Sequence, residues 1–282
     1  MRRNRRWIAL LAVVTVVNYM ITVVVIIFGI YLASFLFNDG RVSTEDLIVS
    51  AGFAVVAGAY AGVRAVVKHL WSVRKRTIAE LGAVRLAPGD LPVIDKIFHE
   101  LSIATGIPRP AAALVADDAP NALAVGRRPA DTTIVVTSGL IEKLSRDELE
   151  AVLAAEMWSI RRHETALYTV VLGLTAETAA FVILPTATVA VFVRKRVLRD
   201  AGFGADMLAV ATTRHPDALR RAIEKLRDDP AVVATLSPST APLWFEPIPH
   251  GDHWPTEDYE NLALTPCLDD RLARLDEQLA TP

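Results

Sequence analysis

The chain has 282 residues and a formal net charge of −2, and 52% of its residues are hydrophobic, with a mean hydropathy of +0.34. A soluble domain normally has about 45–50% apolar residues, so this composition excludes a purely soluble enzyme and a disordered protein. The near-neutral charge argues against a nucleic-acid partner. A single cysteine, Cys267, excludes an internal disulfide framework. The apolar excess falls in three runs, residues 8–37, 47–63 and 166–193.

The first two apolar runs, residues 8–37 and 47–63, contain no charged residue. Because about 20 apolar residues in a helix cross a bilayer, these runs predict two transmembrane helices in a membrane anchor over residues 1–69. The second run contains Gly58-x-x-x-Gly62, a spacing of small residues that lets helices approach closely. Gly58 and Gly62 are therefore candidate contacts for a partner in the membrane.

Basic residues predict how the anchor is oriented. Arginines cluster before the first run, and arginines and lysines follow the second, whereas the connection over residues 38–46 is net acidic. Positive charge favours the cytoplasmic side of the membrane. We therefore expect a multi-pass protein of the plasma (inner) membrane, with the N-terminus and everything after Val67 in the cytoplasm.

The third run, residues 166–193, has basic residues at both ends and is interrupted by Pro185. A single crossing would leave one of the two basic clusters outside the cell. The pattern therefore predicts a hairpin, or a helical excursion covered by protein, that returns to the same side. Glu177 within the run is expected to face protein or water and is a candidate partner-binding residue.

Residues 70–282 predict a cytoplasmic α+β domain that is mainly helical and is interrupted by the run 166–193. Short β-prone stretches between turn signals predict a small antiparallel sheet, and Ser145-Arg-Asp-Glu148 forms a capping box that opens a long helix. The predicted strands cover residues 112–116, 122–125 and 132–137, and further helices cover residues 90–105, 204–213, 217–227 and 268–279.

Residues 230–255 form a proline-rich loop that also contains three large aromatic residues, Trp244, Phe245 and Trp254. Such a composition is typical of a segment that docks a partner, of one that lies over a groove of the same chain, or of a flexible linker. The three aromatic residues are therefore candidates for partner binding.

Several stretches, taken in order, resemble the HtpX-like family of membrane zinc metalloproteases, which are relatives of the CAAX prenyl proteases. They are the two N-terminal apolar runs and residues 119–126, 135–140, 145–154, 203–206 and 265–275. The resemblance covers residues 75–282 and the anchor, and it implies a gluzincin-like metallopeptidase scaffold. Asn121 and Asp206 are retained residues of the family's motifs.

The chemistry of that family depends on His-Glu-x-x-His on a helix, where two imidazoles bind zinc, the glutamate activates water and a later glutamate completes the site. Here residues 155–159 read Ala-Glu-Met-Trp-Ser, and the later glutamate position is Gly202. The resemblance therefore implies a vestigial base, Glu156, and degenerate metal positions at Ala155, Ser159 and Gly202. No metal or other cofactor is expected.

Two large side chains, Met157 and Trp158, follow Glu156 where the family needs room for zinc and substrate. We expect them to fill the vacated cavity and block the groove. No Gly-x-Ser-x-Gly pattern and no glycine-rich phosphate loop offers another catalytic site.

Three functional hypotheses follow from these patterns. The first is a catalytically inactive pseudo-peptidase that is a binding, scaffold or regulatory subunit of a membrane protein complex and holds an extended peptide in the vestigial groove. The alternative is a membrane-bound metalloendopeptidase with a non-standard zinc site, built from Glu156, Asp206 and a histidine among His163, His250 and His253. A third is a lipid- or substrate-gating subunit that uses the third apolar run.

Overall fold

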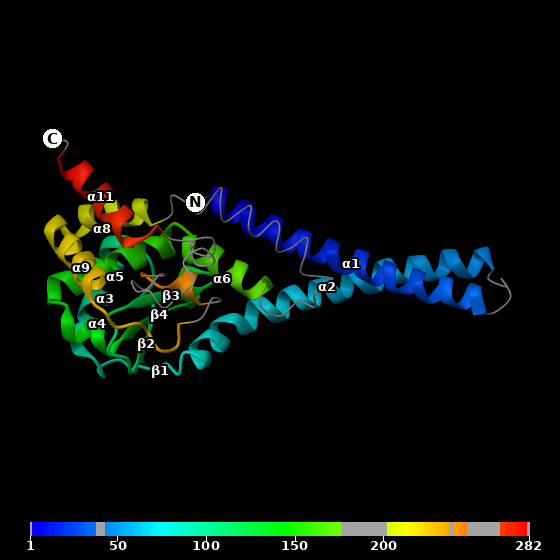
Figure 1. The fold of residues 1–282 in the computed structure, drawn as a ribbon, viewed down its shortest axis with the longest axis horizontal. Helices are drawn as coiled ribbons and strands as arrows, with labels where there is room; N and C mark the ends of the chain where they lie inside the picture. The colour runs from blue at the N-terminus through cyan, green and yellow to red at the C-terminus, as the bar shows by residue number, and fades with distance from the viewer. Residues whose placement is uncertain (1, 38–42, 176–201, 237–239, 247–265, 281–282) are drawn as a thin grey trace.

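A computed structural model of the chain describes residues 2–37, 43–175, 202–236, 240–246 and 266–280. A long helical hairpin projects from a mixed domain in which helices surround a small sheet (Figure 1). The class is α+β and mainly helical, as the sequence predicts.

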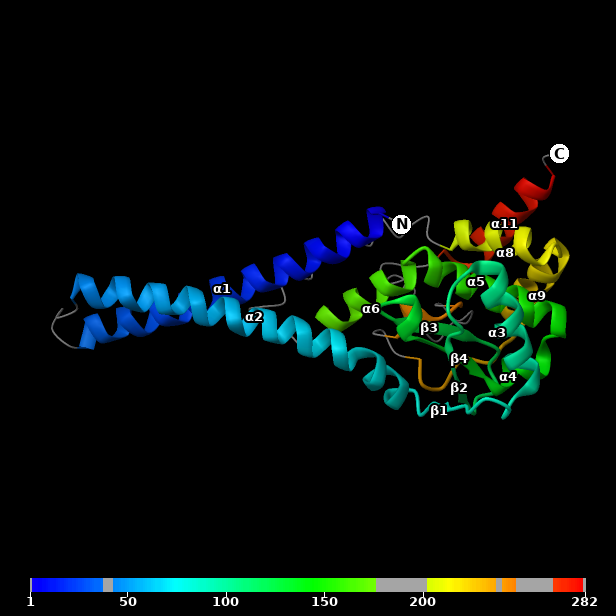
Figure 2. The ribbon, with the colours of Figure 1, turned by 180° about the vertical axis from the view of Figure 1, so that it is seen from behind.

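The hairpin consists of α1 (Arg2–Phe37) and α2 (Thr44–Glu80), which lie side by side along most of their length (Figures 1 and 2). By length and composition, both helices are able to cross a membrane, over Asn4–Phe35 and Leu47–Glu80. Most of their large apolar side chains are exposed, as expected for a surface that faces lipid. α2 continues unbroken beyond residue 69 and enters the domain.

Gly58 and Gly62 lie where α2 crosses α1 most closely. A Cβ atom added to Gly58 would lie 2.8 Å from the Cα atom of Met20, and one added to Gly62 would lie 3.0 Å from that of Val16. Their small size therefore serves close packing inside the hairpin. This corrects the prediction that these glycines contact a partner, because α1 already covers them.

Polar contacts fix the domain to the hairpin at the end where α2 leaves it. Arg74 of α2 forms an ion pair with Asp131 (3.0 Å), and the Arg127 guanidinium stacks 4.5 Å from the ring centre of Trp71. Asn4 of α1 donates a hydrogen bond from Nδ2 to the carbonyl of Arg162 (3.0 Å). The domain is therefore held against both helices.

The sheet contains β1 (Val84–Arg85), β2 (Ala111–Val115), β3 (Ala122–Gly126) and β4 (Thr132–Thr137), in the order β1-β2-β4-β3. The predicted strands are confirmed to within a residue, but the sheet is mixed: β2 and β4 are parallel and the other pairs antiparallel. The antiparallel prediction is wrong because β4 inserts between β2 and β3. The short connections from β2 to β3 and from β3 to β4 each reverse the chain, so β2 and β4 run in the same direction and pair in parallel as neighbours.

Helices cover both faces of this sheet. In β4, Ile134 and Val136 point to one face and Val135 to the other, and all three are buried in two separate hydrophobic clusters. The first face packs against α3 (Pro92–Thr105) and α5 (Arg146–Arg161), and the second against α2 and α6 (Glu164–Thr175). The remaining helices are α4 (Ser138–Lys143), α8 (Phe203–Thr213), α9 (Pro216–Asp228) and α11 (Leu268–Leu279), with 3-10 turns at Pro129–Asp131 and Ala241–Leu243.

The predicted capping box is confirmed at the start of α5. The Ser145 hydroxyl accepts the backbone N–H of Glu148 (3.4 Å), and the Glu148 carboxylate accepts the N–H of Ser145 (2.8 Å). These bonds satisfy two backbone donors that a helix start leaves free. They fix the start of the helix that carries Glu156.

The third apolar run begins in α6, which follows α5 after a break at His163, where φ is 60°. α6 lies beside α1, α2 and β3, and its apolar residues from Ala166 to Leu172 are buried (Figure 2). Residues 176–201, with Glu177, lie outside the described residues. The returning excursion therefore stays a prediction.

Candidate functional site

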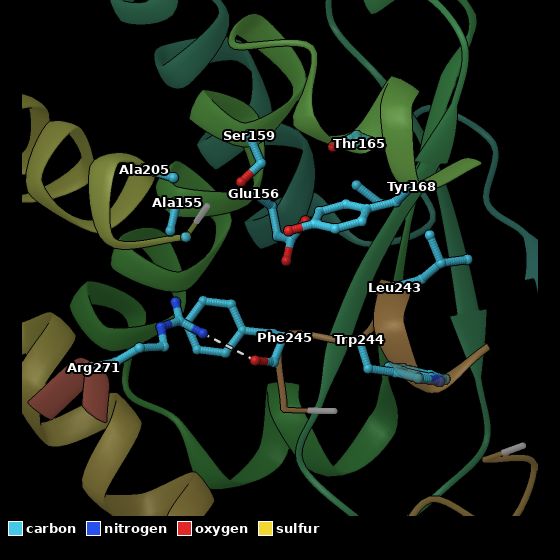
Figure 3. Close-up of a pocket in the computed structure, with 12 residues that line it drawn as sticks. Ala155, Glu156, Ser159, Thr165, Tyr168, Ala205, Leu243, Trp244, Phe245 and Arg271 are labelled. Carbon is cyan, nitrogen blue, oxygen red and sulfur yellow. Dashed lines mark hydrogen bonds between the residues drawn. The ribbon is translucent and has the colours of Figure 1, made fainter. Parts of the chain in front are cut away.

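Residues at the positions that the sequence interpretation singles out line one cavity where α5, α8 and β3 meet (Figure 3). Ala155 and Ser159 lie one turn apart on the same face of α5, and they line the cavity together with Glu156. Gly202 faces them from the start of α8, and Ala124 from β3. The cavity has a volume of about 30 Å³, enough for roughly two water molecules.

Glu156 is the one ionisable residue of the stretch 155–159. Its side chain faces Tyr168 across the cavity (Figure 3), and the residue is only 8% exposed. Burial raises the pKa of Glu156 to about 8, helped by the negative charges of Asp206 and Glu164 and opposed by Arg271. The buried carboxyl therefore holds its proton more tightly than an exposed glutamate does.

The residues around Glu156 do not fit a zinc ion. A zinc site needs at least three ligands from histidine, cysteine or acidic side chains, whereas Ala155, Ser159 and Gly202 offer a methyl group, a hydroxyl group and no side chain. Within the described part of the chain, no three histidine, cysteine or acidic residues lie close enough to hold a metal.

The backbone at Gly202 also disfavours a glutamate there. Its φ is +94°, a left-handed conformation that side-chain-bearing residues rarely adopt. A Cβ atom at this position would also lie 3.3 Å from Cδ of Pro266. Replacement of Gly202 by a ligand would therefore require the start of α8 to change its conformation.

Asp206, the retained acidic residue, forms a buried ion pair with Arg271 of α11. Nε and Nη2 of Arg271 donate to the two carboxylate oxygens at 2.8 and 2.6 Å, and Nη1 donates to the carbonyl of Phe245 at 2.9 Å (Figure 3). The guanidinium also stacks 3.6 Å from the centre of the Phe245 ring. Both charged residues are under 4% exposed, so the pair fixes α8, α11 and residue 245 to one another.

Arg271 and Tyr168 line the cavity although the sequence interpretation did not single them out. Arg271 was recognisable in principle, because it lies on the same face of the last helix as Leu268, Leu272 and Leu275, which are buried. A cation on an apolar stripe predicts a buried anion as its partner. Tyr168 carries no such signal, since an aromatic residue in an apolar run is expected in any core.

Met157 and Trp158 do not line the cavity, which corrects the expectation that they fill it. Met157 is fully buried in the core beneath α5, and Trp158 points toward α8, where its indole N–H donates to the Thr212 hydroxyl (2.8 Å). Successive helical residues turn by about 100°, so these two side chains point away from the face of Glu156. Tyr168, Trp244 and Phe245 narrow the cavity instead (Figure 3).

Trp244 and Phe245 are 0% and 3% exposed. Neither therefore offers a free surface to a partner, contrary to the prediction for the proline-rich loop. Trp254 lies outside the described residues.

The histidines of the alternative zinc site are not brought to Glu156 in the described part of the chain. His163 lies in the break between α5 and α6 and does not line the cavity. Its pKa is lowered, mainly by burial and then by the positive charges of Arg5 and the N-terminus. His250 and His253 lie outside the described residues.

Helices around a small mixed sheet, carried on a hairpin of two helices that are long and apolar enough to cross a membrane, form the scaffold expected of an HtpX-like membrane metallopeptidase. The chain belongs to peptidase family M48, whose model matches residues 90–279.

Its relatives include proteins named "Protease HtpX homolog". That of Tropheryma whipplei (strain Twist) is 30% identical over 260 residues, covering 75% of this chain and 89% of the relative. That of Limosilactobacillus reuteri (strain DSM 20016) is 28% identical over 221 residues, covering 66% and 73%. That of Dictyoglomus thermophilum is 30% identical over 219 residues, covering 66% and 69%. No solved structure matches this chain.

Proposed function

We propose that this chain is a catalytically inactive, HtpX-like membrane pseudo-peptidase that acts as a binding, scaffold or regulatory subunit of a membrane protein complex. The observation that carries the proposal is the chemistry at Ala155, Ser159 and Gly202. These residues surround Glu156 in one cavity and supply neither an imidazole nor a carboxylate.

Zinc peptidases depend on the metal to lower the pKa of a bound water from about 16 to about 7. Glu156 alone offers no such polarisation. The fold is retained without this chemistry, which favours a role in binding.

Metal analysis of the purified full-length protein tests the loss of chemistry. We expect far less than one zinc per chain, no cleavage of unfolded casein, and no effect of Glu156→Gln on either measurement. Stoichiometric zinc would overturn the proposal. It would favour the alternative, a membrane-bound metalloendopeptidase whose site uses His163, His250 or His253.

A gain-of-ligand variant provides a second readout that does not depend on activity. Ala155→His together with Ser159→His places two imidazoles on one face of α5, four residues apart, as in zinc-binding helices. With only two of the three ligands that a zinc site needs, this variant is expected to bind Co²⁺ weakly in equilibrium dialysis, whereas the wild type and Ala155→His alone bind none. Binding of Co²⁺ by the wild-type protein would contradict the proposal.

The same proposal places the domain in the cytoplasm and the chain in the plasma membrane as a multi-pass protein. Its support is the charge asymmetry around the two candidate spans. Reporter fusions after residues 40 and 80 test this topology: alkaline phosphatase is expected to be active only at residue 40, and a fluorescent protein only at residue 80. The reverse pattern would refute the orientation.

Cross-linking in native membranes followed by mass spectrometry tests the partner. A membrane protein cross-linked to the domain or the hairpin is expected. Recovery of a free monomer alone, in gentle detergent and after cross-linking, would count against a complex subunit.

A further inference from the structure

The outer edge of the sheet is occupied by a segment of this same chain. β3 is the last strand in the sheet order, and residues Thr240–Glu246 lie along its free side (Figure 1). Trp244 pairs with Leu123 of β3 in antiparallel orientation, and the N–H of Phe245 donates to the carbonyl of Ala122 at 2.7 Å. An extended peptide added to this edge would use the same backbone groups.

The side chains of this segment alternate as those of a strand do. Trp244 is buried in the hydrophobic cluster on the α2 and α6 side of the sheet, and Phe245 in the cluster on the α5 side. Leu123, opposite Trp244, lies in the same cluster as Trp244. Through a single β-bridge, Trp244 and Phe245 therefore extend both faces of the sheet beyond β3.

Several polar contacts of the segment are made with its main chain. The Asn121 carboxamide donates from Nδ2 to the carbonyl of Glu246 (2.9 Å), and its Oδ1 accepts the N–H of the same residue (3.1 Å). Arg271 donates from Nη1 to the carbonyl of Phe245 (2.9 Å). Because these groups recognise backbone atoms, any extended peptide in the same register could satisfy them.

The fit of the segment is incomplete in one respect. The indole Nε1–H of Trp244 is buried and has no acceptor among the described residues. A buried donor without a partner weakens binding. A competing peptide with phenylalanine or leucine at this position would not leave that donor unpaired.

We propose that residues Thr240–Glu246 are an intramolecular ligand that closes the peptide-binding edge of β3, and that a partner binds there by displacing them. The partner segment that fits is extended and carries two adjacent bulky apolar side chains, for the sites of Trp244 and Phe245. This inference rests on the proposed function in one respect: the bound partner segment is held and is not cleaved.

Disulfide trapping tests whether the edge is closed in the membrane-embedded protein. Leu123 and Trp244 form a pair next to the hydrogen-bonded pair of Ala122 and Phe245, and such non-hydrogen-bonded pairs have the Cα spacing that suits a disulfide. In a Cys267→Ser background, Leu123→Cys/Trp244→Cys is expected to oxidise almost completely, measured as loss of both free thiols by mass spectrometry.

A matched control lies within the sheet. Ala124 and Ile134 are partners in the β3–β4 pair, at the equivalent type of position, so Ala124→Cys/Ile134→Cys is expected to oxidise to the same extent. Oxidation of the control but not of the Leu123–Trp244 pair would overturn the proposal. That result would leave the absence of zinc chemistry untouched, so the two proposals fail separately.

Peptide binding tests displacement. The probe is a fluorescein-labelled peptide with the sequence of residues 240–246, titrated onto the full chain in detergent and followed by anisotropy. A tethered copy competes at an effective concentration in the millimolar range, so weak binding to the wild type is expected. Trp244→Ala loosens the tethered copy and is expected to bind the probe at least tenfold more tightly. A further Asn121→Ala is expected to remove that gain.

The oxidised Leu123→Cys/Trp244→Cys protein has its segment locked and is expected to bind no probe, whereas its reduced form binds. This comparison uses one folded protein in two states and does not depend on the folding of Trp244→Ala. Equal binding by the oxidised and reduced forms, or by neither, would refute displacement. A probe with phenylalanine at the position of Trp244 is expected to bind more tightly than the original.

Discussion

Replacement of Arg271 by methionine is expected to destabilise the domain strongly. The change leaves the carboxylate of Asp206, which is 1% exposed, without its cation. Removal of one member of a buried ion pair typically costs about 3–5 kcal/mol. The carbonyl of Phe245 also loses its donor, and an unsatisfied buried acceptor costs about 1–3 kcal/mol. Because these costs overlap, we expect a loss of about 4 kcal/mol.

Such a loss is a large share of the roughly 5–15 kcal/mol that stabilises a typical domain. The assay is urea unfolding of the full chain in detergent, followed by tryptophan fluorescence. Arg271→Lys keeps the charge but not the planar, two-pronged donor geometry, so an intermediate loss is expected.

A double variant separates the ion pair from simple packing. Asp206→Leu/Arg271→Met removes both charges together, and apolar replacement of a whole buried pair is often nearly neutral. The double variant is therefore expected to be more stable than Arg271→Met alone. The reasoning would be refuted by an Arg271→Met protein within about 0.5 kcal/mol of the wild type, or by a double variant that is less stable than both single variants.

Three further predictions concern the buried acid, the α5 cap and the hairpin. Between pH 4.5 and 8 the folded chain keeps the Glu156 proton that the unfolded chain has released, so the Glu156 contribution to stability is expected to fall as pH rises, by on the order of 4 kcal/mol; Glu246, whose pKa burial also raises to about 8, adds a fall of its own. Urea unfolding across this range checks it, and a Glu156→Gln protein with an unchanged slope would contradict it. Ser145→Ala removes one acceptor of the capping box and is expected to cost about 1 kcal/mol in the same assay; an unchanged midpoint would contradict the cap. Gly58→Leu is expected to cost about 1–3 kcal/mol through overpacking against α1, whereas Gly52→Leu, with no atom within 4 Å of its added Cβ, is the neutral control. Equal melting temperatures for the two leucine variants in detergent would show that the close packing does not matter.

Local patterns in the sequence were sufficient to predict most of the helices and strands. The last helix begins at Leu268 and ends at Leu279 as the apolar spacing predicts, and the capping box places the start of α5 at Arg146. These features depend on residues three or four apart, which interact within one helix whatever surrounds them. The order of the strands in the sheet cannot be read from such local patterns, because the β-propensity of a strand does not specify which strand lies beside it.

The candidate site also has one part that the sequence predicted and another part that only the structure showed. That Ala155, Glu156, Ser159 and Gly202 belong together follows from the resemblance to a known family, and the structure brings them to one cavity. The residues that line the rest of that cavity could not be predicted from the sequence. Met157 and Trp158 are adjacent to Glu156 in sequence yet point elsewhere, while Arg271 reaches the site from more than a hundred residues away.

By itself the sequence determined that two helices are apolar enough to cross a membrane and that the domain is mainly helical. Each of these is a property of side chains or of short-range spacing. Only the tertiary structure decided that Gly58 and Gly62 serve the hairpin, that Asp206 pairs with Arg271, and that residues 240–246 close the edge of β3. Those outcomes depend on which distant surfaces meet, because burial and partner choice arise from the packing of the whole domain.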